Sequence, residues 1–136
     1  MTDLLDLPPT KSAVISADGK YRYYLRRTVS GGSRIATFIM LNPSTADAQA
    51  DDPTIRKCIG FCRLWGCGEL YVVNLFALRA TDPKMIGKTL DPVGTDNRVW
   101  VEHATGCADM VVCACGAYGT YMDQGKNGPW LDHGCL

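Results

Sequence analysis

The chain has 136 residues, of which 46% are hydrophobic, and its 14 basic and 14 acidic side chains give a formal net charge of zero. This length and composition predict a single globular domain, residues 1–136, with a core of its own. The balanced charge gives no argument for binding to nucleic acid or to a membrane surface, and no apolar run is long enough to cross a bilayer. Asp3 and Asp6 stand where a signal peptide would be basic, so we expect a cytoplasmic protein with reduced cysteines.

The first part of the chain predicts a β-hairpin followed by a buried strand. After a loose lead-in at residues 1–11, strand-like runs at 12–16 and 21–28 flank a turn at 17–20. Residues 34–41 then form a nearly continuous apolar run. Such a run is typical of a strand that is buried on both faces.

From residue 53 onward, helices and strands alternate. Asp52 and Pro53 predict the N-cap and the first position of a helix over 53–65, which Gly66 ends. The elements expected after it are a buried strand at 69–78, a short helix or turn at 80–90, a helix at 96–106, a buried strand at 109–116 and an irregular tail at 117–136. This order favours an α/β fold in which the N-terminal hairpin leads into a mainly parallel sheet with helices on its faces.

Polar residues crowd the loop between the first buried strand and the helix. The loop begins with four turn-forming or polar residues: Asn42, Pro43, Ser44 and Thr45. Such residues often bond only to their own backbone, and Asp52 is explained as a helix cap. Four in succession, with Asp47 close behind, exceed what a turn needs, and ligands of open α/β folds bind outside the carboxyl ends of strands. We therefore interpret this loop as a ligand site.

Two further polar residues are expected at the same edge of the sheet. Asn74 interrupts an apolar strand, where its amide either bonds a neighbouring strand or loop or faces a ligand. Arg79 follows at the end of that strand, either as an ordinary ion-paired surface residue or as a partner for an anionic ligand. Asp96 and Asn97 open a later helix, and either Asp96 or Thr95 is expected to cap it, although Asp96 and Asn97 could also reach the same pocket.

Motifs for metals, cofactors and nucleophiles are weak. The chain has seven cysteines but no Cys-x-x-Cys pair, and Cys58 and Cys62 lie on the apolar stripe of the predicted helix. We interpret them as core thiols and expect no metal and no cofactor. A triad of Ser44, His103 and an aspartate can be proposed, but the G-x-S-x-G motif is absent, as are the Walker A loop and the dinucleotide fingerprint.

Several motifs of the chain resemble those of the Domain of Unknown Function family 1643, an uncharacterised bacterial and phage family. The motifs lie at residues 39–48, 52–56, 65–66, 71–83 and 91–97. The resemblance extends from about residue 21 to residue 116, and it implies membership of the family without implying an activity.

Residues 41–44, Leu-Asn-Pro-Ser, are also similar to the first active-site motif of uracil-DNA-glycosylase-like proteins of the mismatch-specific type. In those proteins the Asn-Pro loop positions water and backs a flipped base. The resemblance implies a three-layer fold and an N-glycosidic hydrolase that acts on a nucleobase in DNA or in a nucleotide. The implied catalytic residues are Asn42 and Asp47, and the implied substrate-binding residues are Pro43, Ser44, Thr45, Asn74 and Arg79.

The tail departs from these families. They carry a His-Pro motif in a later segment, whereas residues 127–133 here read Asn-Gly-Pro-Trp-Leu-Asp-His. We interpret the tail as truncated or altered, which makes a degenerate, inactive relative one expectation. Two alternatives stay open: a non-catalytic nucleotide- or nucleic-acid-binding module, and a structural or partner-binding protein whose loop only caps a helix. The binding module requires a shared basic face of Arg56, Lys57, Arg63 and Arg79.

Overall fold

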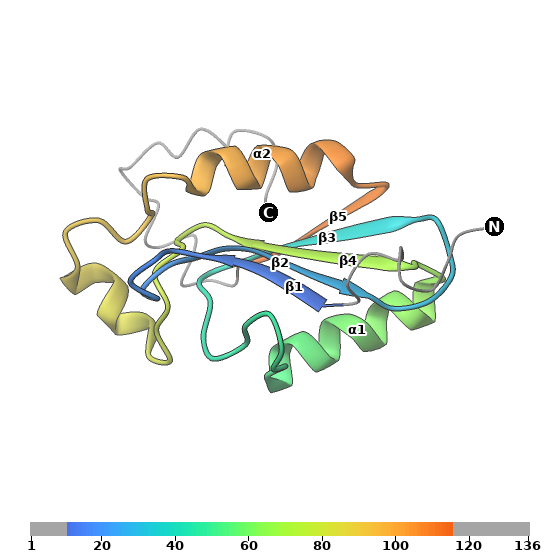
Figure 1. The fold of residues 1–136 in the computed structure, drawn as a ribbon, viewed down its shortest axis with the longest axis horizontal. Coiled ribbons are helices and arrows are strands. Elements are labelled where there is room, and N and C mark those ends of the chain that lie inside the picture. Colours follow the sequence, from blue (N-terminus) through green and yellow to red (C-terminus); the bar gives the residue numbers. More distant parts are fainter. Residues whose placement is uncertain (1–10, 116–136) are drawn as a thin grey trace.

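Residues 11–115 are described by a computed structural model, in which a five-stranded sheet carries one long helix on each face (Figure 1). The strands are β1 (Lys11–Ile15), β2 (Arg22–Thr28), β3 (Ile35–Met40), β4 (Glu69–Asn74) and β5 (Met110–Ala114). The helices are α1 (Pro53–Trp65), the 3-10 helix η2 (Pro83–Lys88) and α2 (Asn97–Cys107). Apart from Lys11, the predicted lead-in lies outside the described residues, and so does the predicted tail.

The sheet is mixed, with the strand order β1-β2-β4-β3-β5. β2 is antiparallel to both β1 and β4, whereas β3 is parallel to both β4 and β5. The α/β class and the N-terminal hairpin are confirmed, but the prediction of a mainly parallel sheet is wrong. The reason is that the hairpin joins the parallel strands along β4, where Leu25 lies opposite Val72, so that half of the pairings are antiparallel.

Helix α1 forms with the predicted bounds because its start and stop signals are local. The Asp52 side chain accepts a hydrogen bond from the Ile55 N–H at 2.9 Å, and Pro53 occupies the first turn. Gly66 ends the helix in the left-handed conformation at φ 73°. The helix buries Ile55 and Cys62 against the sheet, together with the core side chains of β2, β3 and β4.

Helix α2 covers the opposite face of the sheet (Figure 1). Its Val101 and Ala104 pack in a second core cluster with Tyr24 and Val73. Asp96, one of the two expected caps, stands at the N-cap position, but its side chain makes no capping hydrogen bond within the described part of the chain. No helix of residues 11–115 is long and apolar enough to cross a membrane.

Strand β4 ends at Asn74, four residues earlier than predicted. The apolar run continues, and Leu75 and Phe76 still donate to the carbonyl groups of residues 40 and 41, each at 3.0 Å. Ala77 then donates instead to Val93 at 3.1 Å, and Leu78 forms an isolated bridge with Tyr21. The sequence pattern shows the burial of this segment but not its change of partner. The short helix expected within 80–90 is η2, which begins three residues inside that range, and the remaining predicted boundaries lie within two residues of those observed.

Candidate active site at the carboxyl ends of β3 and β4

The chain leaves the adjacent parallel strands β3 and β4 in opposite directions. After β3 it runs to α1 on one face of the sheet, and after β4 it passes through η2 to α2 on the other face (Figure 1). Such a reversal opens a crevice between the two strand ends, and ligands of open α/β sheets bind in this crevice. The polar loop after β3 and the segment after β4 therefore meet where a binding site is expected.

A small inner cavity of about 40 Å³ lies under the polar loop. Its polar lining consists of Arg22, Asn42, Ser44, Asp52, Thr54 and Asn74. Pockets that enclose drug-sized ligands measure about 300–1,000 Å³. The inner cavity is therefore too small for a nucleobase, but it has room for one small polar group.

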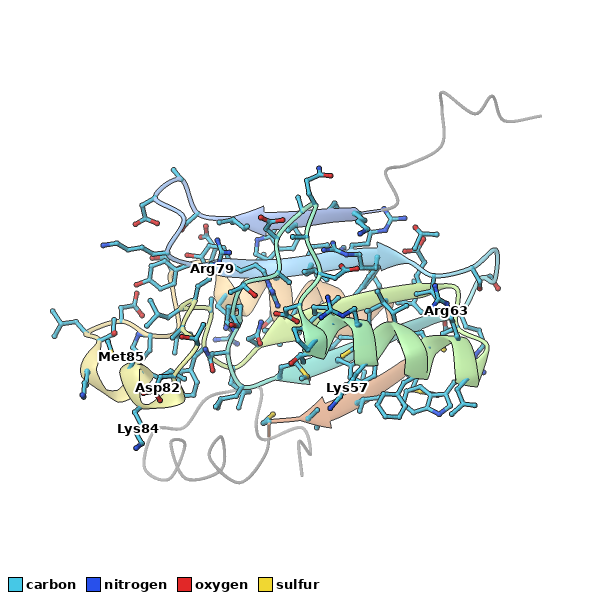
Figure 2. The ribbon with its side chains drawn as sticks, turned by 90° about the horizontal axis from the view of Figure 1, so that it is seen from below. Lys57, Arg63, Arg79, Asp82, Lys84 and Met85 are labelled. Carbon is cyan, nitrogen blue, oxygen red and sulfur yellow. The ribbon has the colours of Figure 1, made fainter. Side chains whose placement is uncertain are left out.

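A larger outer pocket of about 470 Å³ adjoins the same loop. Its walls include Ser44, Arg79, Thr81 and Met85, so that Ser44 belongs to both the inner cavity and the outer pocket. Figure 2 shows Arg79 toward the same end of the molecule as the labelled η2 residues. The volume of the outer pocket suits a small-molecule ligand.

Asn42 joins the two segments that form the site. Its Nδ2 donates to the carbonyl oxygen of Ala80 at 2.7 Å and to that of Pro43 at 3.0 Å. The Ala80 N–H in turn donates to the Pro43 oxygen at 2.9 Å. The amide nitrogen thus holds the loop after β3 to the segment after β4. Oδ1 is the Asn42 side-chain atom that remains to contact a ligand or water.

Arg79 lies half-buried at the edge of the outer pocket. Its guanidinium makes long hydrogen bonds, at 3.3 Å to the carbonyl of Ser44 and at 3.4 Å to those of Thr45 and Gly19. None of the ion pairs among residues 11–115 involves Arg79. Asp82 shares the wall of the outer pocket with Arg79, and the Arg79 charge is one of the influences that lower the pKa of Asp47.

The other predicted site residues divide into two groups. Pro43, Ser44 and Asn74 line the inner cavity beside Asn42, whereas Thr45 and Asp47 line neither of the two cavities. The Asp47 carboxylate accepts the N–H groups of Ala50 and Gln49, each at 2.8 Å, and these bonds lower the pKa of Asp47 below 3.8. Asp47 thereby closes its own loop.

A family model described as a protein of unknown function, DUF1643, matches residues 22–128. The chain belongs to the DUF1643 family. This confirms the family that the motifs indicated. No curated protein and no solved structure matches the chain, so the similarity to uracil-DNA-glycosylase-like proteins finds no support in these comparisons.

In this DUF1643 protein, three arginines hold the polar loop through its carbonyl groups, and the sequence analysis singled out only Arg79. Arg22 Nη1 donates at 3.1 Å to residue 46, and Arg27 Nη2 donates at 2.6 Å and 3.2 Å to residues 47 and 50. With the bonds of Arg79, the acceptors are Ser44, Thr45, Ala46, Asp47 and Ala50. A signal was present, because β2 places arginines among aromatic and aliphatic residues and the loop supplies several aspartates.

Cys58, Cys62 and His103, which were considered as metal ligands or catalytic residues, line neither cavity of this DUF1643 site. Within the described residues, no group of three or more histidine, cysteine or acidic side chains is placed to hold a metal. Burial raises the pKa of Cys58 to about 11 and that of Cys62 to about 12. His103 lies on α2, with its ring centroid 5.7 Å from those of Tyr24 and Trp100, on the face of the sheet opposite α1.

Proposed function

We propose that this protein binds a nucleotide or another nucleobase-bearing anionic ligand in the outer pocket. The observation that carries the proposal is the position of a pocket of about 470 Å³ at the point where the chain leaves β3 and β4 toward opposite faces. Arg79 on its wall would hold a phosphate, since a guanidinium matches two phosphate oxygens at once. Leu78 and Met85 supply apolar surface for a base, and Thr81 supplies a hydroxyl.

The distribution of basic residues favours a small ligand over a duplex. Lys57 and Arg63 lie along α1, whereas Arg79 lies apart from them toward η2 (Figure 2). Arg56 donates to the backbone of Asp51 at 3.2 Å. Binding to a duplex usually engages a continuous row of cations along the phosphate backbone. The proposal therefore rests on the outer pocket and not on a basic face shared by Arg56, Lys57, Arg63 and Arg79.

Hydrolysis of an N-glycosidic bond is the second candidate, because Asn42 and Asp52 converge on the inner cavity. In that reaction Asn42 Oδ1 would orient the attacking water. A base must accept the water proton, and a carboxylate that already accepts backbone N–H groups is a weak base. Asp47 is held in this way and lines neither cavity. Both Asp52 oxygens are engaged in the loop and the α1 cap, where they accept from Ala46 at 3.3 Å and from Ile55 at 2.9 Å. Binding without catalysis is therefore the better-supported proposal.

Calorimetric titration with nucleosides, nucleoside mono-, di- and triphosphates and short single-stranded DNA tests the binding proposal. Arg79→Gln should weaken phosphate-bearing ligands at least tenfold, because charge-assisted bonds contribute about 1.5–3 kcal/mol. The matched control is Arg98→Gln, since Arg98 pairs with Glu102 on the exposed side of α2. Saturable binding that is lost in the Arg79 variant alone supports the site. Absence of binding to every compound by folded protein contradicts the proposal.

A base-release assay on the compounds that bind tests the hydrolase candidate. Asn42→Asp keeps the size of the side chain but removes the amide donors to Ala80 and Pro43, and Asn42→Ala removes the whole group. If the protein is a hydrolase, Asn42→Ala should abolish release while much of the binding is kept. If the wild-type protein binds these compounds and releases no base from them, the catalytic candidate is excluded and the binding proposal stands.

A further inference from the structure

Arg22 is a buried cation without a matching anion. It is 2% exposed, and none of the ion pairs that the structure describes includes it. Its Nη1 donates to the carbonyl of Ala46 at 3.1 Å, but its buried Nε has no hydrogen-bond partner among residues 11–115. A buried charge that is neither paired nor fully hydrogen-bonded costs several kcal/mol.

A β-bulge brings Arg22 to the inner cavity. Val14 of β1 lies opposite Tyr24, but Ile15 lies opposite Arg22, so that Tyr23 is an extra residue in β2. Without the bulge, strict alternation would put Arg22 on the face of Tyr24, which packs in the core under α2. Bulges are frequent beside binding sites, where they redirect a side chain. Here the bulge moves a cation from the α2 face to the cavity beneath the polar loop.

Asn74 provides a second, independent observation in the same cavity. It is 1% exposed, and neither Nδ2 nor Oδ1 has a partner within the described part of the chain. One role expected of the Asn74 amide was to bond a neighbouring strand or loop. Asn97 fills this role, because its Nδ2 donates to the backbone oxygens of residues 74 and 75 at 2.8 Å and 3.2 Å. The Asn74 amide and the Arg22 guanidinium thus both offer unused N–H donors to one small space.

Arg27 is a buried arginine with a structural role, and it provides a comparison for Arg22. It is 1% exposed, like Arg22, and it serves the same loop. It has a carboxylate partner, Asp51, at 2.7 Å, and its other nitrogens donate to four backbone oxygens. Arg22 receives no such partner. Asp52 is the carboxylate that most favours the charged form of Arg22, but its oxygens are engaged with the N–H groups of Ala46 and Ile55.

We propose that the inner cavity is an oxyanion subsite, in which Arg22 Nε and Asn74 Nδ2 donate to one anionic oxygen group, a carboxylate or a terminal phosphate. Ser44, which borders both spaces, stands where such a group would enter from the outer pocket. Burial lowers the pKa of Arg22 to about 10, so the guanidinium remains charged at neutral pH. The inference rests on the proposed function only for the part of the ligand that would occupy the outer pocket. The oxyanion alone is expected to bind in the inner cavity.

The test uses thermal unfolding of the full chain with sodium phosphate, sodium acetate and sodium chloride at matched ionic strength. A bound anion stabilises the folded state by mass action, so the unfolding midpoint should rise saturably with phosphate or acetate and not with chloride. A response to phosphate alone identifies a phosphate group, and a response to both identifies any small oxyanion. Equal responses to all three salts at every concentration overturn the inference.

Two substitutions locate the anion. Asn74→Asp places a carboxylate beside Arg22, so it should raise the midpoint of the protein without added oxyanion and weaken phosphate binding at least tenfold. Arg22→Met removes the unpaired charge at similar volume, so it should also abolish the oxyanion response. Arg98→Gln serves as the control and should respond like the wild-type protein. A wild-type response in both substituted proteins overturns the inference.

A direct measurement on the wild-type protein covers the case in which either variant fails to fold. The Arg22 Nε–H resonance in nitrogen-15 correlation spectra should shift on titration with phosphate, whereas that of Arg98 should not. An unshifted Arg22 resonance overturns the inference. Nucleotide binding without any response of Arg22 to phosphate or acetate overturns the oxyanion subsite alone. A phosphate response at Arg22 without any nucleotide binding overturns the proposed function alone.

Discussion

Arg27→Met should destabilise the protein strongly. Arg27 Nε lies 2.7 Å from Asp51 Oδ1, and the guanidinium also holds the carbonyl groups of residues 47 and 50. Removing one member of a buried ion pair costs about 3–5 kcal/mol, because the other member is left without its partner. Asp51 is 18% exposed and keeps a bond to Lys11 at 3.4 Å, so water and Lys11 compensate part of this loss. We expect a destabilisation of about 3 kcal/mol, a large share of the roughly 5–15 kcal/mol of a typical domain.

The neighbouring residue in β2 provides a matched control. Arg26 forms a two-bond pair with Glu69, both bonds at 3.0 Å, but its side chain is 25% exposed. Because solvent screens such a pair, Arg26→Met should cost only about 1 kcal/mol. Equilibrium urea denaturation followed by tryptophan fluorescence gives both free energies of unfolding, provided that the slopes with denaturant agree.

Equal losses in the two variants would refute this reasoning, because Arg27 is more buried than Arg26 and also holds carbonyl groups of the polar loop. Arg27→Lys adds a finer comparison. Lysine keeps the charge but cannot contact Asp51 and two carbonyl groups with one planar fork. Its loss of stability should lie between those of wild type and Arg27→Met. A lysine variant as stable as wild type would show that charge alone holds the loop.

Three further predictions concern pH, backbone conformation and thiol reactivity. Burial raises the pKa of Asp51, but the hydrogen bond and the charge of Arg27 outweigh burial and hold the pKa below 3.8. The contribution of Asp51 to stability is therefore present above about pH 4 and is lost as the pH falls through the lowered pKa. Urea denaturation at several acidic pH values should show this loss in wild type and little of it in Asp51→Asn. Gly94→Ala should cost clearly more stability in urea than Gly19→Ala, because both glycines have positive φ but only at Gly94 would the new Cβ lie 2.8 Å from a ring atom of Tyr23. In iodoacetamide at pH 8, followed by mass spectrometry, exposed Cys107 should be alkylated in the folded protein, whereas Cys62, buried and with its pKa raised to about 12, should react only after unfolding.

The parts of the fold that could be predicted from sequence depend on neighbours in the chain. The bounds of α1 follow from Asp52, Pro53 and Gly66, each of which acts within one turn of the helix. The hairpin and the buried strands follow from the alternation or continuity of apolar residues. The antiparallel pairing of β2 with β4 was missed because it joins residues more than 40 positions apart, and the amino-acid pattern of β2 does not name its partner.

The candidate site was predicted in the same uneven way. Asn42, Ser44 and Asn74 were found because polar residues at the end of an apolar strand are conspicuous in a sequence. Arg22 was missed because its access to the cavity depends on one extra residue in β2, and a bulge of this kind leaves little trace in the pattern of side chains. Asp47 shows the opposite case, since a polar residue in a conspicuous loop serves the turn that contains it.

Each of the two cavities is lined by one arginine and one aspartate, Arg22 with Asp52 in the inner cavity and Arg79 with Asp82 in the outer pocket. Of the three arginines that hold the polar loop, only Arg27 has a carboxylate in contact, whereas Arg22 and Arg79 line the inner cavity and the outer pocket. Burial increases the electrostatic effect of such charges, because little water is present to screen them. The position of the site follows from the connections of β3 and β4, and its cations are arginines of β2 and of the segment after β4. The crevice and the unpartnered donors of Arg22 and Asn74 are two independent features that support the proposed oxyanion site, which is the reason to test oxyanions before any other class of ligand.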